Sequence, residues 1–289
     1  MWLPLLCACC IALLQLAPAE AGQSARFLQY TGEFDYGLNV LPPWADGGRL
    51  EINFPEHLER YPDTWGILRY SDKDPAGRWE VSADGMKAVL DVDSVTMPGV
   101  HVTGMGTVVS PTRIEFAMRI ENHSDKTLPG IVPLYCFRYS GLTGFPKWQK
   151  NFQHTYVLMD GKVTKLADIT TANPEADVKG GYVKGNPQRD SDHFPASRGG
   201  LITQPIDRAI IAIISLDGRR VMLLAWTPGK TILSNAAIPC AHADAYYGPI
   251  EPGKSVECTG VLIFTEEPVE RAMQNMVREG LGGGGGPKG

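Results

Sequence analysis

The stretch "TRIEFAMRIE", residues 112–121, alternates between apolar and charged side chains with a period of two. Successive side chains of a β-strand point to opposite faces, so this alternation predicts a strand with one face in a core and the other in water. The expected core side chains are Ile114, Phe116, Met118 and Ile120, and the expected solvent side chains are Arg113, Glu115, Arg119 and Glu121.

Asp-Gly pairs stand between apolar or alternating runs at Asp84-Gly85, Asp160-Gly161 and Asp217-Gly218. Asp-Gly suits tight hairpins because both residues can adopt positive φ there, so each pair predicts a hairpin. We expect further strands around residues 49–54, 65–70, 100–109 and 131–139, and a last long strand in "KSVECTGVLIF", residues 254–264.

The only convincing helix is "PVERAMQNMVREG", residues 268–280, with Pro268 at the first helical position and Gly280 at the stop. Its apolar stripe is expected to dock on a sheet, and it consists of Val269, Ala272, Met273 and Met276. Many strands and one helix predict an all-β chain: a large antiparallel β-sandwich in one domain over residues 22–280. Residues 281–289, "LGGGGGPKG", are predicted to be a disordered tail.

The chain begins "MWLPLLCACCIALLQLAPAEAG", in which the apolar run over residues 2–16 is too short to span a bilayer. Small residues in Ala-x-Ala spacing follow it, which predicts a signal peptide over residues 1–21 and a secreted or periplasmic protein. A lipoprotein signal acylated at Cys9 is the second interpretation, because little apolar sequence precedes Cys9.

The formal net charge is −5, and the sequence contains no basic stripe, which argues against a nucleic-acid partner. No later apolar run is long enough for a membrane span.

Removal of the signal peptide would leave Cys136, Cys240 and Cys258. In an oxidising compartment Cys240 and Cys258 are the pair nearer in sequence, and three buried thiols are the alternative. This part of the chain has no Cys-x-x-Cys pattern, so a zinc ribbon or a thioredoxin-type site is not indicated. No metal or other cofactor is expected.

Residues 168–200 lack a sustained apolar period and are rich in Gly, Pro and Asp. Connections of that length are usually functional or disordered, so we expect a loop that lies over one sheet face. Its middle, "QRDSDHFP", contains Asp192 and His193.

The stretch "TRIEFAMRIENHSDKTLPGIVPLYCFRY", residues 112–139, resembles the middle of the galactose-mutarotase-like sandwiches, in which an Asn-x-Ser/Thr-Asp turn and a Leu-Pro join two strands. The matching residues are Asn122, Ser124, Asp125, Leu128 and Pro129. The closing "IEPGKSVECTGVLIF" resembles the family's last turn and strand, and the resemblance as a whole extends over about a third of the chain. The resemblance implies a galactose-mutarotase-like sandwich with a carbohydrate ligand.

Sugar epimerases of that superfamily carry a catalytic histidine in the strand after the Leu-Pro. The corresponding run here, "VPLYCFRY", contains Tyr135 and Cys136 and no histidine. Mutarotation needs an acid and a base, and one expected partner is absent from this run. Whether the chain is an enzyme therefore stays open.

The stretch "CAHADAYYG" contains the candidate catalytic pair, His242 and Asp244, which would share a face of a strand because they are two residues apart. A histidine oriented by a carboxylate suits acid/base chemistry or metal binding, and a turn in which both are structural is the alternative. Asp192 and His193 are expected to complete the catalytic set by folding over the same sheet face, with Trp148 or Tyr135 nearby. The expected sugar-binding side chains are Trp65, Arg69, Tyr135, Trp148, His154 and Tyr246.

The sequence therefore predicts an exported carbohydrate-binding or carbohydrate-active β-sandwich protein. The alternative is a non-catalytic envelope or accessory protein that uses the sandwich for protein contacts.

Overall fold

The computed structural model describes residues 23–29, 37–60, 79–94, 97–128, 130–148, 152–185 and 200–284 of the 289-residue chain, with the side chains of 54–60, 131 and 132 left out. The predicted signal peptide, the predicted strand at 65–70 and residues 285–289 of the predicted tail lie outside the described residues.

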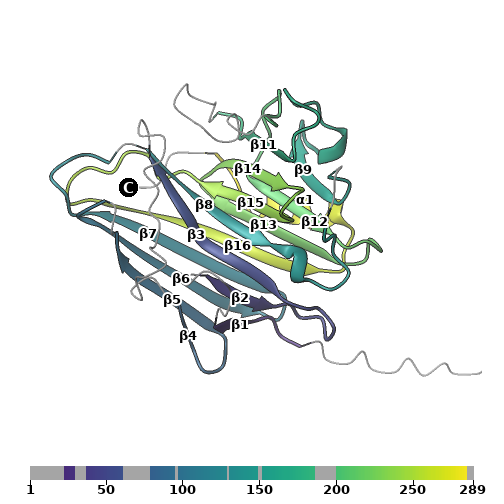
Figure 1. Cartoon of the computed structure of the whole chain (residues 1–289), viewed down its shortest axis with the longest axis horizontal. Helices are drawn as coiled ribbons and strands as arrows, with labels where there is room; N and C mark the ends of the chain where they lie inside the picture. Colours follow the sequence, from purple (N-terminus) through teal and green to yellow (C-terminus); the bar gives the residue numbers. More distant parts are fainter. Residues whose placement is uncertain are drawn as a thin grey trace, which may run out of the picture.

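The described strands form two antiparallel sheets that pack face to face (Figure 1). The seven-stranded sheet consists, in spatial order, of β1 (Arg26–Gln29), β2 (Leu38–Leu41), β3 (Leu50–Arg60), β8 (Ile131–Arg138), β15 (Cys240–Ala245), β14 (Gly229–Asn235) and β11 (Val178–Tyr182). The nine-stranded sheet consists of β10 (Lys162–Lys165), β9 (Thr155–Met159), β12 (Ile210–Ile214), β13 (Val221–Thr227), β16 (Ser255–Thr265), β7 (Arg113–Asn122), β6 (Val100–Ser110), β5 (Lys87–Asp93) and β4 (Glu80–Val81). Short 3-10 turns, η2 (Tyr139–Gly141) and η3 (Leu166–Asp168), follow β8 and β10. The predicted all-β sandwich is confirmed.

The core between the sheets is built from the inward sides of both. The four apolar side chains of β7 are all buried in it, as their alternation predicts. The ring of Trp226 on β13 stacks on Tyr135 of β8, with ring centroids 4.1 Å apart. A Cβ at Gly260 of the neighbouring β16 would lie 2.4 Å from this indole, so the strand must be bare there for the ring to lie across it.

All three Asp-Gly hairpins are present, but only one has the predicted backbone. Between β9 and β10, Asp160 and Gly161 both have positive φ, at 49° and 74°. At Gly85 and Gly218 only the glycine is left-handed, and the loops are longer than two residues. In those loops the aspartate side chain takes a different role: Asp84 Oδ1 accepts the backbone N–H of Met86, as in an Asx turn.

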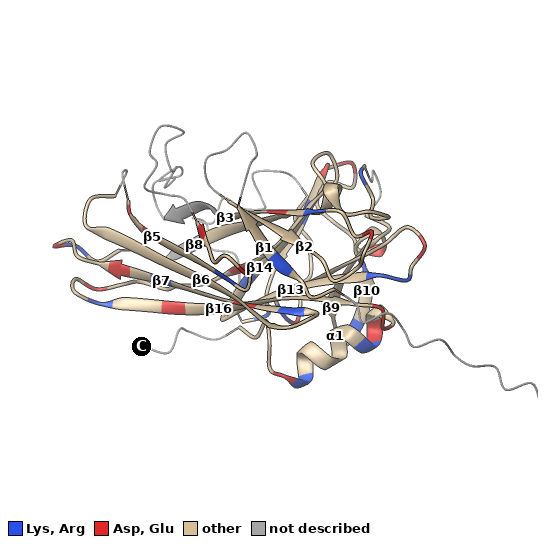
Figure 2. Ribbon diagram, turned by 90° about the horizontal axis from the view of Figure 1, so that it is seen from below, with Lys and Arg blue, Asp and Glu red and all other residues tan. Residues whose placement is uncertain are grey.

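The helix α1 (Val269–Arg278) lies on the outer side of the nine-stranded sheet, away from β3 and β8 (Figure 2). Its predicted apolar stripe is buried against the outward side chains of β12, β13 and β9, which include Ile210, Leu223 and Leu158. Pro268 stands one position before its predicted place, as the N-cap residue, and Gly280 follows the helix with φ of 80°. No helix in the described ranges is long and apolar enough to cross a bilayer.

The predicted loop over residues 168–200 is wrong at one point, because it contains β11. This strand pairs with β14, and its other edge is bonded to the chain that returns at Gly200 and Ile202. Gly180 and Gly181 interrupt the apolar pattern, so the sequence did not predict this strand. Gly181 packs closely on Ile202, whose side chain would lie 3.1 Å from an added Cβ.

Candidate functional site

The outer face of the seven-stranded sheet carries the most chemically varied cluster of the described side chains. On β15, Ala241, Ala243 and Ala245 face the core between the sheets. By alternation Cys240, His242 and Asp244 face the other way, so the prediction that His242 and Asp244 share a strand face is confirmed. Both are buried, with His242 4 % and Asp244 0 % exposed.

The strand register brings Cys136 and Asn53 to the same face. β8 lies beside β15, with Phe137 opposite Ala241, so Cys136 falls beside His242. β3 lies on the other side of β8, with Asn53 directly opposite Cys136. Directly opposed residues of antiparallel strands point to the same side, so Asn53, Cys136 and His242 form a row across three strands.

The two thiols and the imidazole are close together. One ligand-type atom each from Cys136, Cys240 and His242 lies within 4.8 Å of the others. Cys240 Sγ is 3.5 Å from His242 Nε2. We refer to these three residues as the Cys2His cluster.

Asp244 is anchored by the strands on both sides of it. Its Oδ1 accepts the backbone N–H of Tyr135 at 3.1 Å, and its Oδ2 accepts the hydroxyl of Thr231 at 2.9 Å. Its Oδ1 is also 3.8 Å from Nδ1 of His242. The carboxylate is therefore fixed in place and faces the ring nitrogen that points away from Cys240.

The electrostatics of His242 combine two opposing effects. Burial disfavours the charged ring and on its own lowers the pKa of His242. The sulfur of Cys240 and the carboxylate of Asp244 act in the opposite direction and prevail, so the pKa is raised well above its ordinary value. This site favours a protonated imidazole.

The three described cysteines form no disulfide. The Cys240–Cys258 disulfide, one of the two predicted alternatives, is therefore wrong, and three buried thiols are correct. Cys258 lies on β16, in the other sheet, where its thiol is 3.8 Å from the carbonyl of Tyr246. Burial raises the pKa of Cys258 to about 12. Cys240 instead lies on the outer face, beside His242.

Of the predicted sugar-binding residues, Tyr135 is on the wrong side of its strand. Its ring is fully buried between the sheets, where its hydroxyl is 3.1 Å from that of Tyr247. The neighbouring residue Cys136 holds the outward position instead. Trp148 is 77 % exposed and lies just beyond the turn that follows η2.

The remaining predicted site residues are either in other parts of the fold or outside the described residues. His154 stands at the start of β9, in the nine-stranded sheet, and burial lowers its pKa. Tyr246 follows β15 and is half-buried, with Lys230 Nζ 4.8 Å from its ring centroid. Trp65, Arg69, Asp192 and His193 lie outside the described residues, so their roles stay predictions.

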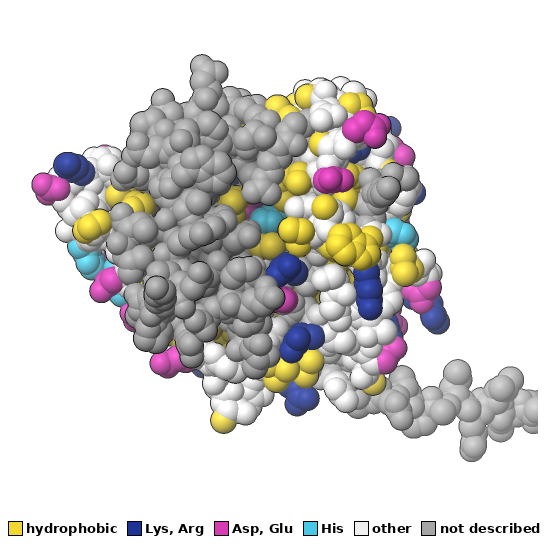
Figure 3. All heavy atoms as spheres, in the orientation of Figure 1, with side chains coloured by type: hydrophobic (Ala, Val, Ile, Leu, Met, Phe, Trp, Pro, Cys, Tyr) yellow, Lys and Arg dark blue, Asp and Glu magenta, His cyan; other side chains and the backbone are white. Residues whose placement is uncertain are grey.

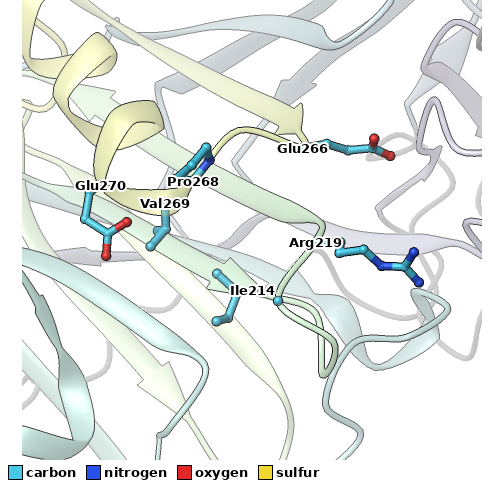
Figure 4. Close-up of a pocket in the computed structure, with 7 residues that line it drawn as sticks. Ile214, Arg219, Glu266, Pro268, Val269 and Glu270 are labelled. Carbon is cyan, nitrogen blue, oxygen red and sulfur yellow. The ribbon is translucent and has the colours of Figure 1, made fainter.

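A hollow lies at the start of α1, beside the β12–β13 turn (Figure 4). Glu266, Glu270 and Arg219 are its charged lining residues. Arg219 is already paired with Asp217, at 2.7 Å in the same turn. The hollow therefore offers ordinary surface charges and no group with unusual reactivity.

Charged side chains of both signs are scattered over the face seen in Figure 3 rather than gathered in one basic patch.

No family model and no curated protein matches the chain. Solved structures with a similar fold include the Slr1438 protein from Synechocystis sp. PCC 6803, with 13% identity, a TM-score of 0.43, and coverage of 85% of this chain and 93% of that one. A galactose 1-epimerase from Lactobacillus acidophilus NCFM matches with 11% identity, a TM-score of 0.38, and coverage of 84% and 99%. The polysaccharide lyase BACCELL_00875 matches with 9% identity, a TM-score of 0.40, and coverage of 88% and 34%. The resemblance expected from the sequence is thus present among these matches. Since identities are this low, it concerns architecture alone, and the chemistry must be argued from this chain's own side chains.

Sequence reasoning missed the Cys2His cluster, although half of its signal was available. Cys240 stands two residues before His242, the same spacing that placed His242 and Asp244 on one face. Asp192 and His193 of the long loop were expected to complete the set, whereas Cys240 stood beside the pair in sequence. Cys136 was out of reach because the register of β8 against β15 is a tertiary fact.

Proposed function

We propose that the protein binds a carbohydrate on the outer face of the seven-stranded sheet, with His242 and Asp244 at the centre of the site. The observation that carries the proposal is the set of buried polar side chains on that one face, namely Asn53, Thr231, His242 and Asp244.

Burying polar groups costs stability unless they are well paired, by about 1–3 kcal/mol for each group that is left unsatisfied. A sheet face that only had to be covered would be served better by apolar side chains, as the docking site of α1 shows. An amide, an imidazole, a carboxylate and a hydroxyl together offer the donors and acceptors that sugar hydroxyls require.

Asn53 adds a specific indication. Its Oδ1 is buried and has no hydrogen-bond partner among the described residues. An orphaned acceptor of this kind calls for an explanation, and a ligand hydroxyl would satisfy it.

The sequence resemblance to the galactose-mutarotase-like sandwiches supports the same ligand class, and the signal-like N-terminal stretch supports an exported protein. The proposal is one of binding first. The strand after the Leu-Pro lacks the family's histidine, so any catalysis would depend on His242 with Asp244 and, from the long loop, Asp192 and His193.

A panel of mono- and oligosaccharides, read by thermal shift, tests the proposal, because a ligand that binds only the native state raises the melting temperature. We expect at least one saccharide to stabilise the wild type and to lose that effect in His242→Gln. The matched control is His101→Gln, which removes a histidine beside two carboxylates on the nine-stranded sheet and should bind as the wild type does.

Two outcomes would contradict the proposal. If no saccharide stabilises the wild type, the alternative interpretation, an accessory protein that contacts other proteins, is favoured. If His242→Gln retains full stabilisation, the ligand binds elsewhere.

A further inference from the structure

We infer that the Cys2His cluster is a binding site for a thiophilic divalent cation such as Zn²⁺, with Cys136, Cys240 and His242 as its ligands. This inference goes beyond carbohydrate binding and does not depend on it. It rests on geometry, on charge balance and on the support that His242 receives from Asp244.

The geometry matches a partly closed zinc site. Bond lengths of about 2.3 Å to sulfur and about 2.0 Å to nitrogen, at a tetrahedral angle, place the two ligand atoms about 3.5 Å apart. Cys240 Sγ and His242 Nε2 are 3.5 Å apart. Cys136 completes the set within 4.8 Å, so a small rotation of its side chain would close the triangle.

The charges balance in a buried setting. Two thiolates and a neutral imidazole around Zn²⁺ give a net charge of zero, which removes most of the cost of burying each ion alone. On binding, the thiols of Cys136 and Cys240 and the protonated Nε2 of His242 release their protons to solvent, and each of the three atoms forms a bond to the metal through the electron pair left behind. No oxidation or reduction occurs.

Asp244 supplies the outer support that histidine ligands commonly have. Metal-bound histidines usually direct the other ring nitrogen toward a carboxylate or carbonyl, which fixes the ring and its tautomer. Here Nδ1 of His242 faces Oδ1 of Asp244 at 3.8 Å, and Nε2 faces Cys240. The backbone N–H of Tyr135 and the hydroxyl of Thr231 hold that carboxylate, so it serves the ring rather than the cation.

The soft ligands select the kind of metal. Thiolate and imidazole favour Zn²⁺ and related thiophilic ions over Mg²⁺ and Ca²⁺, which prefer oxygen ligands. Three protein ligands leave the fourth tetrahedral position open. Asn53 lies beside Cys136 on the same face of the sheet, and its Oδ1 is buried next to the cluster.

Co²⁺ titration of the reduced, chelator-treated full chain tests the inference, because Co²⁺ replaces Zn²⁺ in such sites and is coloured. We expect a thiolate-to-Co²⁺ charge-transfer absorption that saturates at a stoichiometric amount of Co²⁺ and disappears when Zn²⁺ is added. Absorption of hydrated Co²⁺ alone, with no charge-transfer band, would overturn the inference. The full chain also contains Cys7, Cys9 and Cys10, so the variants below are needed to assign the band to the Cys2His cluster.

Cys136, Cys240 and Cys258 provide a matched set of variants. Cys136→Ser and Cys240→Ser should each lose the charge-transfer band, whereas Cys258→Ser, which alters a buried thiol of the other sheet, should keep it. Equal bands in all three variants would show that Co²⁺ binds elsewhere. No saccharide enters these experiments, so the metal site and the carbohydrate site can fail separately.

Discussion

Two histidines of this sandwich lie beside carboxylates on the outer faces of opposite sheets, and they differ in burial. His101 on β6 lies between Asp93 at 2.8 Å and Asp91 at 3.4 Å, and these aspartates are 89% and 72% exposed. His242 on β15 lies beside Asp244, and both are buried. Water can replace every partner of the first cluster and none of the second. The difference teaches that the buried cluster persists at a cost in stability, which makes it the better candidate for function.

The largest expected effect is that of Asp244→Ala. The change leaves the backbone N–H of Tyr135 and the hydroxyl of Thr231 without their acceptor and removes the anion beside His242. Loss of one partner from a buried pair typically costs about 3–5 kcal/mol. Denaturant unfolding should show that loss, whereas the exposed counterpart Asp93→Ala should stay within about 0.5 kcal/mol. Equal effects at both positions would remove the contrast between the two faces.

A smaller loss is expected from Thr231→Val, which keeps the shape of the side chain and removes the donor to Asp244 Oδ2. Hydrogen bonds to charged groups contribute about 1.5–3 kcal/mol, so the free energy of unfolding should fall by about 2 kcal/mol. In a double-mutant cycle with Asp244→Ala, most of this loss should disappear, because the two changes remove the same bond. Additive losses would mean that Thr231 acts through something else.

The free energy of unfolding should depend on pH through Cys258, the buried thiol of the nine-stranded sheet. Burial raises the pKa of Cys258 to about 12, above its value of about 8.5 in an unfolded chain. The stabilisation from its neutral form is fully present below the unfolded pKa and is lost as the pH rises toward 12. Stability should therefore fall by about 1.4 kcal/mol per pH unit just above pH 9.

Cys258→Ala should remove that slope. Tyr247, whose pKa is also raised well above its ordinary value, adds its own pH dependence once the unfolded-state tyrosine pKa of about 10 is reached, so the comparison belongs between pH 9 and pH 10. A slope unchanged by Cys258→Ala would place the titrating group elsewhere.

The smallest effect is expected at the rim of the buried face, where Arg138 and Glu51 form a half-exposed ion pair at 2.9 Å. Pairs of this kind contribute about 0.2–1 kcal/mol and weaken as salt screens them. Arg138→Met should therefore cost less than about 1 kcal/mol at low ionic strength, and the difference should shrink in concentrated salt. A large, salt-independent loss would extend the buried face to include this pair.

The sequence predicted the orientation of a strand only where its local pattern allowed a single interpretation. The alternation of Ile114 and Phe116 with charged residues oriented β7 correctly, because only one face could enter a core. The run around Tyr135 and Cys136 is apolar on both sides, so nothing in it indicated which of the two would face inward. That orientation depends on the pairing of β8 with its neighbours.

Two other outcomes have similar explanations. The sequence did not predict β11 because glycine has low strand propensity, and Gly181 is explained only by its close packing against Ile202. The position of Cys240 relative to His242 followed from a period of two, whereas the free state of Cys258 depended on which sheet each strand joins.

The edges of the two sheets bear on how the protein behaves at high concentration. β4 has two residues, too few to template pairing with another chain, and β10 at the opposite edge carries Lys162 and Lys165. The outer edge of β11 is bonded to the returning chain at Gly200 and Ile202. On β1 the backbone N–H groups around Phe27 bond to loop carbonyls of the nine-stranded sheet. Each described edge is short, charged or already used, so the sandwich resists strand-by-strand aggregation.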